Sequence, residues 1–306
     1  MILIITHKGD FTADFVIDKL NKQEIKYYRF NCEDIDKENY LFSKENHFTF
    51  QLSNLNSFHS VWFRRTKLPD LQVENESEKL YFLGEYDSLL NNLFMQLNTK
   101  KWLSNPTFVY QAENKIFQLQ IAQKIGFKIP DTIITNQHSV LKGFLSKHNN
   151  NIIVKPLSQG RIRNDSGLKL IYTSKITTNI IDKIDTYSLT PSIYQEYIAK
   201  EYELRITVVN KKVFAAKVDS QKYDGTKTDW RKAKIPFEKY LLPIDIEIKC
   251  IELVQKLNLA FGAIDMIKNS KGDYVFLEIN PNGQWAWLDI EAGLNISQEI
   301  ITYLTE

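Results

Sequence analysis

The sequence predicts an α/β fold in which a parallel sheet at the N-terminus is followed by a mixed α+β region. The first sixty or so residues alternate short apolar runs with an amphipathic helix, a β-α-β order typical of an open parallel sheet. From Pro191 onward the chain alternates strand and turn signals, with one helix expected at 245–257. The segment Leu-Ser-Asn-Pro at 103–106 breaks a long helical stretch, so we expect a first domain over residues 1–104.

Apolar periodicity defines the expected elements of this first domain. Residues 1–6 are expected to form a buried strand, and Asp10 or Thr12 would cap the helix that follows. The inward side of that helix is expected to carry Phe11, Phe15, Val16 and Leu20. Further strands are expected at 25–30, 47–52 and 58–63, and a helix at 77–102. No glycine-rich fingerprint follows the first strand, which excludes a dinucleotide site there.

The middle of the chain predicts a helix at 113–125, which Gly126 would end. Short strands at 133–134 and 152–155 flank a helix expected near 137–147. Lys155 ends the second of these strands and precedes a loop that contains Gly and Ser, an arrangement that recurs where loop N–H groups face a phosphate. The loop is not a Walker A sequence.

Composition excludes several classes of protein. In 306 residues, 39 Lys plus Arg balance 37 Asp plus Glu, so nothing favours a nucleic-acid partner. The two cysteines, Cys32 and Cys250, are far apart, and we expect free, half-buried thiols rather than a disulfide or a metal site. The five histidines show no ligand spacing. No stretch approaches the roughly 18 apolar residues that a spanning helix needs, so we expect a soluble, cytoplasmic protein.

The segment 263–280 carries the clearest chemical signal. Two alternating runs flank the turn formers at 269–273, which predicts a β-hairpin. A loop over 270–273 would pair Asn269 with Tyr274 and place Asp265 opposite Glu278, with their Cβ atoms about 4.5–5.5 Å apart. The same face of the second strand would carry Asn280.

Two carboxylates held this close repel each other unless a cation lies between them. Oxygen ligands without His or Cys suit magnesium, so Asp265, Glu278 and Asn280 are candidate Mg²⁺ ligands. The alternative is an ordinary solvent-exposed face of an antiparallel sheet. The sequence Asn-Pro-Asn-Gly that includes and follows Asn280 favours the site, because it fixes the chain beside the acidic cluster.

A second hairpin is expected over 203–219. Its apolar residues fall into two sets, Leu204, Ile206, Val208 and Phe214, Ala216, Val218. A three-residue loop at 210–212 keeps both sets on one face and sets Arg205 opposite Lys217, with Glu203 and Asp219 on the same polar face. A two-residue loop would put Arg205 and Lys217 on opposite faces. We expect the three-residue loop, which makes Arg205 a candidate phosphate clamp. The alternative is an Arg–Glu pair on a wet sheet.

The motifs in this part of the chain resemble, in their order, those of ATP-grasp enzymes. They are ENK at 113–115, IIVKP at 152–156, YQEYI at 194–198, ELR at 203–205, DM at 265–266 and LEIN at 277–280. The resemblance implies that Lys115 and Lys155 contact the phosphates of ATP and that the linker with Glu196 and Ile198 binds adenine. It also implies that Arg205 contacts the terminal phosphate or an acyl phosphate.

The resemblance further implies that Asp265, Glu278 and Asn280 hold magnesium, two ions being expected, in agreement with the hairpin argument. It implies three parts: a pre-ATP-grasp domain over 1–104, a central lobe over 105–195 and a C-terminal lobe over 196–306.

A closer resemblance is to the microviridin-type graspetide synthetases. Its motifs are WFRR at 62–65, WLSNP at 102–106, KVDSQ at 217–221, DWR at 229–231 and LEINPNGQWAWLD at 277–289. Such enzymes phosphorylate Asp or Glu side chains of a ribosomal precursor peptide, which has a leader and a core, and close macrolactones or macrolactams. Arg231 is then expected to orient the acceptor carboxylate or stabilise the acyl phosphate, and Lys217 and Asp219 are further substrate candidates.

The phosphate loop departs from that pattern. Its glycines, Gly160 and Gly167, are spread among Arg161, Arg163 and Asp165. A lid that orders on nucleotide binding would explain this composition. Two alternative functions stay open: a ligase that joins an amino acid to a protein tail or small molecule, and a non-catalytic ATP-binding regulator. The sequence also leaves open whether the protein forms a homodimer.

Overall fold

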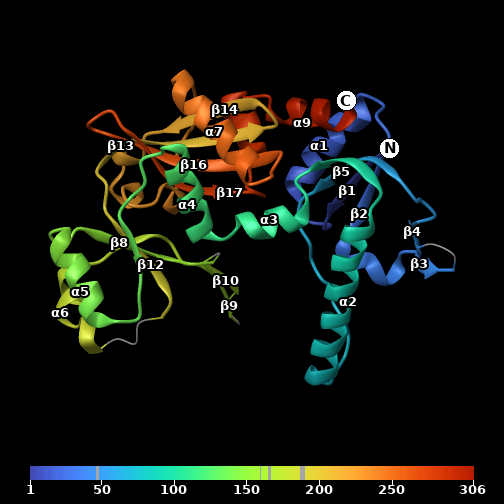
Figure 1. Cartoon of the computed structure of the whole chain (residues 1–306), viewed down its shortest axis with the longest axis horizontal. Helices are drawn as coiled ribbons and strands as arrows, with labels where there is room; N and C mark the ends of the chain where they lie inside the picture. The colour runs from blue at the N-terminus through green and yellow to red at the C-terminus, as the bar shows by residue number, and fades with distance from the viewer. Residues whose placement is uncertain (46–47, 159, 165–166, 187–189) are drawn as a thin grey trace.

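The computed structural model describes residues 1–45, 48–158, 160–164, 167–186 and 190–306. An N-terminal domain, a central lobe and a C-terminal lobe are each built on a sheet of their own (Figure 1). In Figure 1 the N-terminal domain lies on the right, and the central lobe lies on the left below the C-terminal lobe.

The N-terminal sheet has four strands, and all neighbouring strands are parallel. In spatial order they are β2 (Tyr27–Asn31), β1 (Ile2–Thr6), β5 (Phe58–Phe63) and β6 (Thr99–Leu103). Every residue of β1 is buried, as expected for a central strand of a parallel sheet covered on both faces. The predicted β-α-β start is therefore confirmed. A separate antiparallel hairpin joins β3 (Tyr40–Lys44) to β4 (Phe48–Leu52), after the 3₁₀ helix η1 (Cys32–Lys37).

Helix α1 (Phe11–Lys22) begins after Asp10, whose carboxylate accepts hydrogen bonds from the backbone N–H groups of Thr12 and Ala13. Asp10 is thus the cap, not Thr12. Val16 and Leu20 are buried as predicted, but Phe11 is 61% exposed and the prediction for it is wrong. Phe11 is the first helical residue, and Thr12 and Ala13 take the buried positions of that turn.

The helix expected at 77–102 is shorter in the structure. Helix α2 (Glu76–Gln96) ends before Leu97, which has extended backbone angles, and 99–103 form β6. Pairing with β5 explains the difference, because ladder hydrogen bonds outweigh the helical propensity of this segment. Within α2 only Leu90, Leu93 and Phe94 are buried, so the first half of the helix projects from the body (Figure 1).

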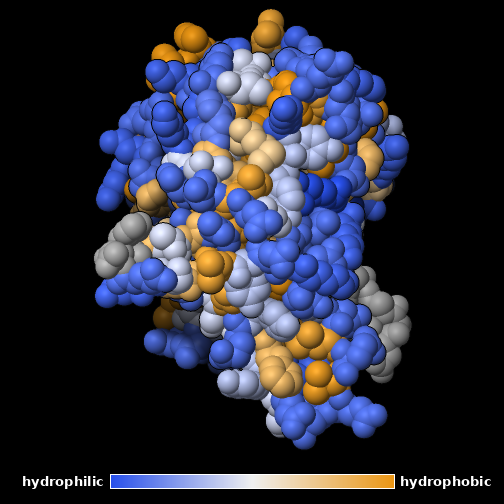
Figure 2. Space-filling view, turned by 90° about the vertical axis from the view of Figure 1, so that its right-hand side faces the viewer, coloured by the Kyte–Doolittle hydropathy of each residue, from blue (hydrophilic) through white to orange (hydrophobic). Residues whose placement is uncertain are grey.

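Figure 2 shows the face of the molecule to which the N-terminal domain belongs. Hydrophilic side chains dominate it, and apolar side chains gather toward its lower end, the end to which α2 projects. Exposed apolar residues of that part of α2 are Leu80, Tyr81 and Phe82. Among the described helices, including α2, none combines the length and apolar character needed to cross a bilayer.

Two helices connect the N-terminal domain to the lobes that follow. Helix α3 (Pro106–Ala112) is capped by Asn105, and α4 (Lys115–Ile125) is capped by Asn114. Gly126 ends α4 with a left-handed conformation (φ 87°), which glycine adopts without steric cost. The predicted helix at 113–125 corresponds to α4.

The central lobe is an antiparallel sheet covered by helices. Its strands, in spatial order, are β11 (Ser174–Lys175), β8 (Ile152–Pro156), β12 (Ser192–Glu196) and β7 (Thr132–Ile134). Its helices are α5 (His138–Lys147), α6 (Thr178–Asp182) and the 3₁₀ helix η2 (Ile184–Thr186). A two-stranded ladder of β9 (Arg161–Asn164) and β10 (Gly167–Leu170) follows Lys155. In this predicted phosphate loop, Asp165 lies outside the described residues, and the side chains of Arg161 and Arg163 are not described.

The C-terminal lobe is built on a five-stranded antiparallel sheet. In spatial order its strands are β15 (Glu238–Tyr240), β14 (Lys212–Val218), β13 (Lys200–Val209), β16 (Phe261–Asn269) and β17 (Tyr274–Asn280). Its helices are α7 (Ile244–Lys256), α8 (Ala286–Ala292) and α9 (Ile296–Thr305). The 3₁₀ helices η3 (Ser220–Lys222), η4 (Asp224–Thr226) and η5 (Trp230–Lys232) lie between β14 and β15.

This sheet is apolar on both faces. On one face, Leu204, Ile206 and Val208 pack in a core shared with α7. On the other face, Ala216 and Val218 belong to a second core that contains residues of the N-terminal sheet and of α9. The N-terminal domain is therefore packed directly against the sheet of the C-terminal lobe.

The predicted register of the 203–219 hairpin is wrong for this reason. Val209 pairs with Lys212, which leaves a two-residue turn, and Arg205 faces Ala216 while Lys217 faces Leu204. Asn210 adopts a left-handed conformation (φ 54°) that favours a tight turn. The prediction assumed a single apolar face, but both faces are buried, so the two apolar sets do not have to meet.

The 263–280 hairpin reaches its predicted pairing by another route. Lys268, not Asn269, pairs with Tyr274, and a bulge then shifts the register between Asp265 and Met266. The shift restores the expected pair of Asp265 and Glu278.

Candidate functional site

A cleft of about 1040 Å³ brings together residues of all three parts of the chain. Its walls include the ends of β8 and β12, the start of α4, and the facing strands β13, β16 and β17. The predicted residues that line it are Lys115, Lys155, Glu196, Ile198, Arg205, Arg231, Asp265, Glu278 and Asn280. Residues predicted from separate motifs thus meet in one cleft.

Two carboxylates and an amide lie together on the floor of this cleft. Asp265 of β16 pairs in register with Glu278 of β17. Asn280 donates from Nδ2 to Oδ2 of Asp265 at 3.4 Å. Burial raises the pKa of the Asp265 carboxyl, and the nearby charge of Glu278 adds to this, while Arg205 opposes it.

Two lysines neutralise Glu278. Lys115, the first residue of α4, lies 2.7 Å from the Glu278 carboxylate, and Lys155 at the end of β8 is buried nearby. Burial alone would raise the pKa of Glu278, but Lys155 and Lys115 outweigh it and hold this pKa at about 2. Burial lowers the pKa of Lys155 to about 8, although Glu278 opposes the effect. At this end, then, the cleft presents cations to an anionic ligand.

Arg205 is held on two sides. Its Nη1 donates to both carboxylate oxygens of Asp265, at 3.0 and 2.9 Å, and its Nη2 donates to the backbone carbonyl of Gln284 at 3.2 Å. Gly283 lies against the same group: a Cβ there would come within 2.6 Å of Nη2. The ELR motif indicated Arg205 but not its partner Gln284, which lies 79 positions further along the chain.

Arg231 lies at the rim of the cleft with half of its side chain exposed. Asp229 accepts two hydrogen bonds from its guanidinium, at 2.8 and 2.5 Å, and one from the backbone N–H of Thr173 at 3.2 Å. Burial would raise the pKa of Asp229, but the Arg231 pair overcomes this and lowers it. Asp229 thus joins Arg231 to the central lobe.

The other end of the cleft is formed by the strand-to-strand linker between the lobes. Glu196 ends β12, where its carboxylate accepts from the backbone N–H of Asp131 at 3.2 Å. Ile198 follows on the same wall. Nearby, the buried pair Lys200 and Glu203 meets at 2.8 Å.

Gln118 is a structural member of the site that sequence reasoning missed. It is 3% exposed, and it donates to the carbonyl of Ile279 at 2.8 Å and accepts from its N–H at 3.0 Å. It therefore fastens α4 to the strand that carries Glu278. The sequence did contain one indication of this role: Gln118 is a polar residue next to Leu119, which with Ala122 belongs to the buried side of the helix.

Lys217 and Asp219, both described by the structure, are not among the residues that line the cleft. They pair with each other at 3.0 Å, and Lys217 lies over the ring of Tyr202 at 4.8 Å. The two-residue turn explains the separation, because it sends Lys217 to the face opposite Arg205. Their substrate role stays a prediction without support from this geometry.

The donor set fits a hard cation. The side chains that could bind the cation are those of Asp265, Glu278 and Asn280. Each offers an oxygen ligand, the kind that magnesium prefers. Within the described part of the chain, no cluster of three or more His, Cys, Asp or Glu residues has the arrangement of a metal site. Two carboxylates with an amide would therefore need phosphate or water oxygens to complete the coordination.

The family models divide the chain in two. The model of the RimK-like ATP-grasp domain matches residues 112–304, and the model of the MvdD pre-ATP-grasp domain matches residues 1–109. A comparison with curated proteins found no match.

Solved structures match over nearly the whole chain. A RiPP-associated ATP-grasp ligase of Chryseobacterium gregarium, in complex with ADP and a leader and core peptide, is 30% identical, with 99% of this chain and 96% of that chain covered and a TM-score of 0.88. The macrocyclase MdnC of Microcystis aeruginosa MRC, bound with precursor peptide MdnA, is 29% identical, with 99% of each chain covered and a TM-score of 0.87. The ATP-grasp ligase PsnB, at 17% identity, 99% and 97% coverage and a TM-score of 0.80, shares the fold.

These matches confirm the predicted family and fold. The chain belongs to the RimK-like ATP-grasp family of ATP-dependent ligases, with an MvdD-type pre-ATP-grasp domain at its N-terminus.

Proposed function

We propose that this ligase phosphorylates Asp or Glu side chains of a ribosomally made precursor peptide and closes ester or amide macrocycles through acyl phosphates. The observation that carries the proposal is the cleft in which Lys115, Lys155, Arg205 and Arg231 surround Asp265 and Glu278. Two of the similar proteins, the Chryseobacterium gregarium ligase and MdnC, are bound to such peptides.

The nucleotide occupies the cleft from the linker to the carboxylates. Glu196 and Ile198 lie where adenine binds, and Lys115 and Lys155 contact the phosphates. Asp265, Glu278 and Asn280 would hold magnesium, two ions being expected, and the metal would screen the negative charge of the phosphates. The register pair of Asp265 and Glu278, with the Asn280 amide beside it, supports a hard cation at this position.

In the first step, a carboxylate oxygen of the peptide attacks the γ-phosphorus, and the bond between that phosphorus and the β–γ bridging oxygen breaks, releasing ADP. Arg205 screens the charge on the transferred group, and positioning with electrostatics supplies most of such catalysis. In the second step a hydroxyl or amine attacks the acyl carbon, loses its proton, and phosphate leaves. Arg231 orients the acceptor carboxylate and contacts the acyl phosphate.

The test is mass spectrometry of a precursor peptide. The peptide is the product of a short open reading frame next to the gene of this protein, chosen because it encodes repeated Ser, Thr or Lys and Asp or Glu residues. It is incubated with enzyme, ATP and Mg²⁺. The proposal expects loss of one water per ring, formation of ADP, and no mass change with the Asp265→Asn variant. A gain of one amino-acid residue in mass would instead establish the second candidate, ligation of an amino acid to a peptide or protein.

That second candidate shares every residue of the ATP site, and the RimK-like match keeps it open. A non-catalytic regulator fits less well, because the cleft retains both lysines and all three oxygen ligands. The division at residues 105 and 196, and a homodimer, stay predictions.

A further inference from the structure

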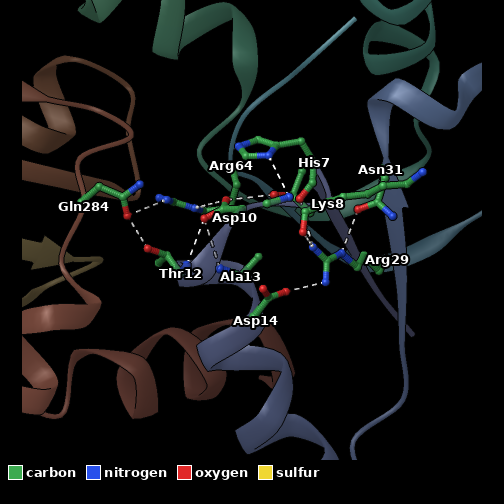
Figure 3. Close-up of polar contacts among 12 residues, drawn as sticks. His7, Lys8, Asp10, Thr12, Ala13, Asp14, Arg29, Asn31, Arg64 and Gln284 are labelled. Carbon is green, nitrogen blue, oxygen red and sulfur yellow. Dashed lines mark hydrogen bonds and ion pairs between the residues drawn. The ribbon is translucent and has the colours of Figure 1, made fainter. Parts of the chain in front are cut away.

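A polar network crosses from the N-terminal domain into the C-terminal lobe beside the cleft (Figure 3). Thr12 of α1 donates a short hydrogen bond from its hydroxyl to the side-chain oxygen of Gln284. Arg64, which follows β5, donates from Nη2 to the same oxygen at 3.4 Å. One atom of the C-terminal lobe is therefore held by two donors of the N-terminal domain.

The donor Arg64 is fixed in turn. Its Nε lies 3.2 Å from Oδ2 of Asp10, and the Arg64 and Asp10 residues are 1% and 2% exposed. Asp10 also accepts from the Thr6 hydroxyl at 2.9 Å and caps α1. A buried ion pair with these further bonds cannot change its geometry without leaving a charge unpaired, so the guanidinium holds one orientation.

The backbone of Gln284 contacts Arg205, a residue of the cleft. Its carbonyl oxygen accepts from Nη2 of Arg205 at 3.2 Å. The preceding loop is a turn in which the N–H of Gly283 donates to the carbonyl of Asn280 at 3.1 Å. Nε of Arg205 is buried without a hydrogen-bond partner among the described residues, so the Gln284 carbonyl and Asp265 are the contacts that orient this guanidinium.

We propose that Gln284 is a positioning residue for Arg205. Its side chain, held by Thr12 and Arg64, fixes the backbone carbonyl that orients the Arg205 guanidinium toward the γ-phosphate. We call this set of contacts the Gln284 bridge. The inference rests on the role of Arg205 in the proposed function, and it assigns to the N-terminal domain a part in phosphoryl transfer that acts through Gln284 and Arg205.

The bridge affects the γ-phosphate more than the rest of the nucleotide. A guanidinium that recognises a phosphate does so through a planar set of donors, so a small rotation weakens the contact. At the adenine end of the cleft, the Glu196 carboxylate accepts from the backbone N–H of Asp131, which is not part of the bridge. Loss of the bridge should therefore reduce the gain in affinity that the γ-phosphate provides, while affinity for ADP is retained.

The experiment measures affinity for ADP and for a non-hydrolysable ATP analogue, both with Mg²⁺, together with kcat for ATP turnover. Gln284→Met keeps the length of the side chain but removes the acceptor. We expect kcat to fall roughly 10- to 100-fold, because misplacement of about 1 Å has effects of this size. The affinity ratio between the two nucleotides should fall as well. Gln284→Glu retains an acceptor for both donors and should restore most of the activity.

Two further variants separate positioning from folding. Thr12→Val removes one of the two donors to the Gln284 side chain. It should lower kcat as Gln284→Met does, but by a smaller factor. Gln298→Met is the matched control, since Gln298 accepts from Gln23 at 3.1 Å across the same pair of domains and is not among the residues that line the cleft. It should leave kcat and the affinity ratio unchanged. Loss of activity in Gln298→Met equal to that in Gln284→Met would overturn the inference.

A double-mutant cycle with Arg205→Met makes the decisive comparison. If Gln284 acts through Arg205, adding Gln284→Met to Arg205→Met changes the affinity ratio no further. Additive effects, or an unchanged ratio in Gln284→Met alone, would overturn the inference and leave the proposed function intact. An unchanged ratio in Arg205→Met would overturn the role of Arg205 and the inference with it.

Discussion

Lys115 and Glu278 lie 163 residues apart in the sequence, and 2.7 Å separates the ammonium nitrogen from the carboxylate oxygen. The first belongs to α4 and the second to β17. Gln118 holds the same two elements together by its hydrogen bonds to Ile279. The cationic and anionic halves of the cleft are thus fixed to each other before any phosphate is bound.

Replacing Lys115 with Met should remove one phosphate contact and the partner of Glu278. We expect ATP turnover to fall roughly 100-fold or more, the size seen when one preorganised electrostatic contact is lost. Lys124→Met, on the exposed last turn of the same helix, is the control and should keep full turnover. Equal activity of the two variants in an ADP-release assay would exclude a phosphate-binding role for Lys115.

Asp265→Asn should abolish magnesium-dependent turnover, because an amide is a weaker ligand for a hard cation than a carboxylate. Titration of wild type and variant with Mg²⁺, after removal of metal with EDTA, measures the effect. Asp273→Asn is the matched control at the far end of the same hairpin, where Asp273 pairs with Lys128 at 2.6 Å. If Asp265→Asn and wild type respond to Mg²⁺ in the same way, the metal assignment is wrong.

Arg231→Ala should lower peptide modification more than nucleotide binding, since Arg231 lies at the rim of the cleft with half of its side chain exposed. Calorimetry with ADP and mass spectrometry of the peptide give the two quantities. Lys232→Ala, next along the same exposed turn, should change neither. A parallel loss of ADP affinity and peptide modification in Arg231→Ala would refute a substrate role.

Asp10→Asn should destabilise the fold in a pH-dependent manner. Burial raises the pKa of Asp10, but Arg64 outweighs it, so the pKa in the folded state lies below its usual range. A lowered pKa stabilises the folded state above about pH 4, and that contribution is lost as the pH falls through the folded-state value. We expect a loss of roughly 3–5 kcal/mol at pH 7, the cost of leaving a buried partner unpaired.

Urea denaturation at pH 7, 5 and 3.5 tests this expectation. The difference in the free energy of unfolding between wild type and Asp10→Asn should begin to shrink at the lowest pH, because Asp10 of the unfolded chain then binds protons while the folded carboxylate, with its lowered pKa, still resists protonation. A difference that stays constant over this range would contradict the ionised pair.

Gly283→Ala should impair turnover by a steric route. The added Cβ would lie 2.6 Å from both Nη2 of Arg205 and the Cβ of Ala263, closer than such atoms approach, so the loop or the guanidinium must move. We expect kcat to fall about 10-fold or more. Gly84→Ala, where a Cβ meets nothing within 4 Å, is the control and should stabilise α2 by up to about 1 kcal/mol. Unchanged kcat in Gly283→Ala would show that Arg205 tolerates displacement.

Local patterns were sufficient for some parts of this site. Alternation and turn residues predicted the pairing of Asp265 with Glu278, although the predicted loop was too short and the bulge compensated for the error. The wrong partner for Arg205 followed from one assumption, that apolar residues of a hairpin share a face. The second core, which covers the other face, depends on the packing of the N-terminal domain and leaves no mark in the hairpin itself.

Other contacts could not be predicted from local sequence at all. Gln284 meets Arg64 across 220 positions, and nothing in either motif indicates the partner. The strand β6 has the composition of a helix end, and its pairing with β5 gives it the extended conformation. For residues whose environment depends on distant elements, the local sequence pattern predicted the wrong partner or conformation, or none.

The sheet of the C-terminal lobe, apolar on both sides, limits how such a protein can be re-engineered. Exchanging the N-terminal domain for that of a relative would also exchange part of a hydrophobic core and the anchor of Gln284. A chimaera joined at the α3 linker would therefore need matched residues at Thr12, Arg64 and the contacts of α9. The N-terminal domain and the C-terminal lobe are thus built to change together rather than as interchangeable modules.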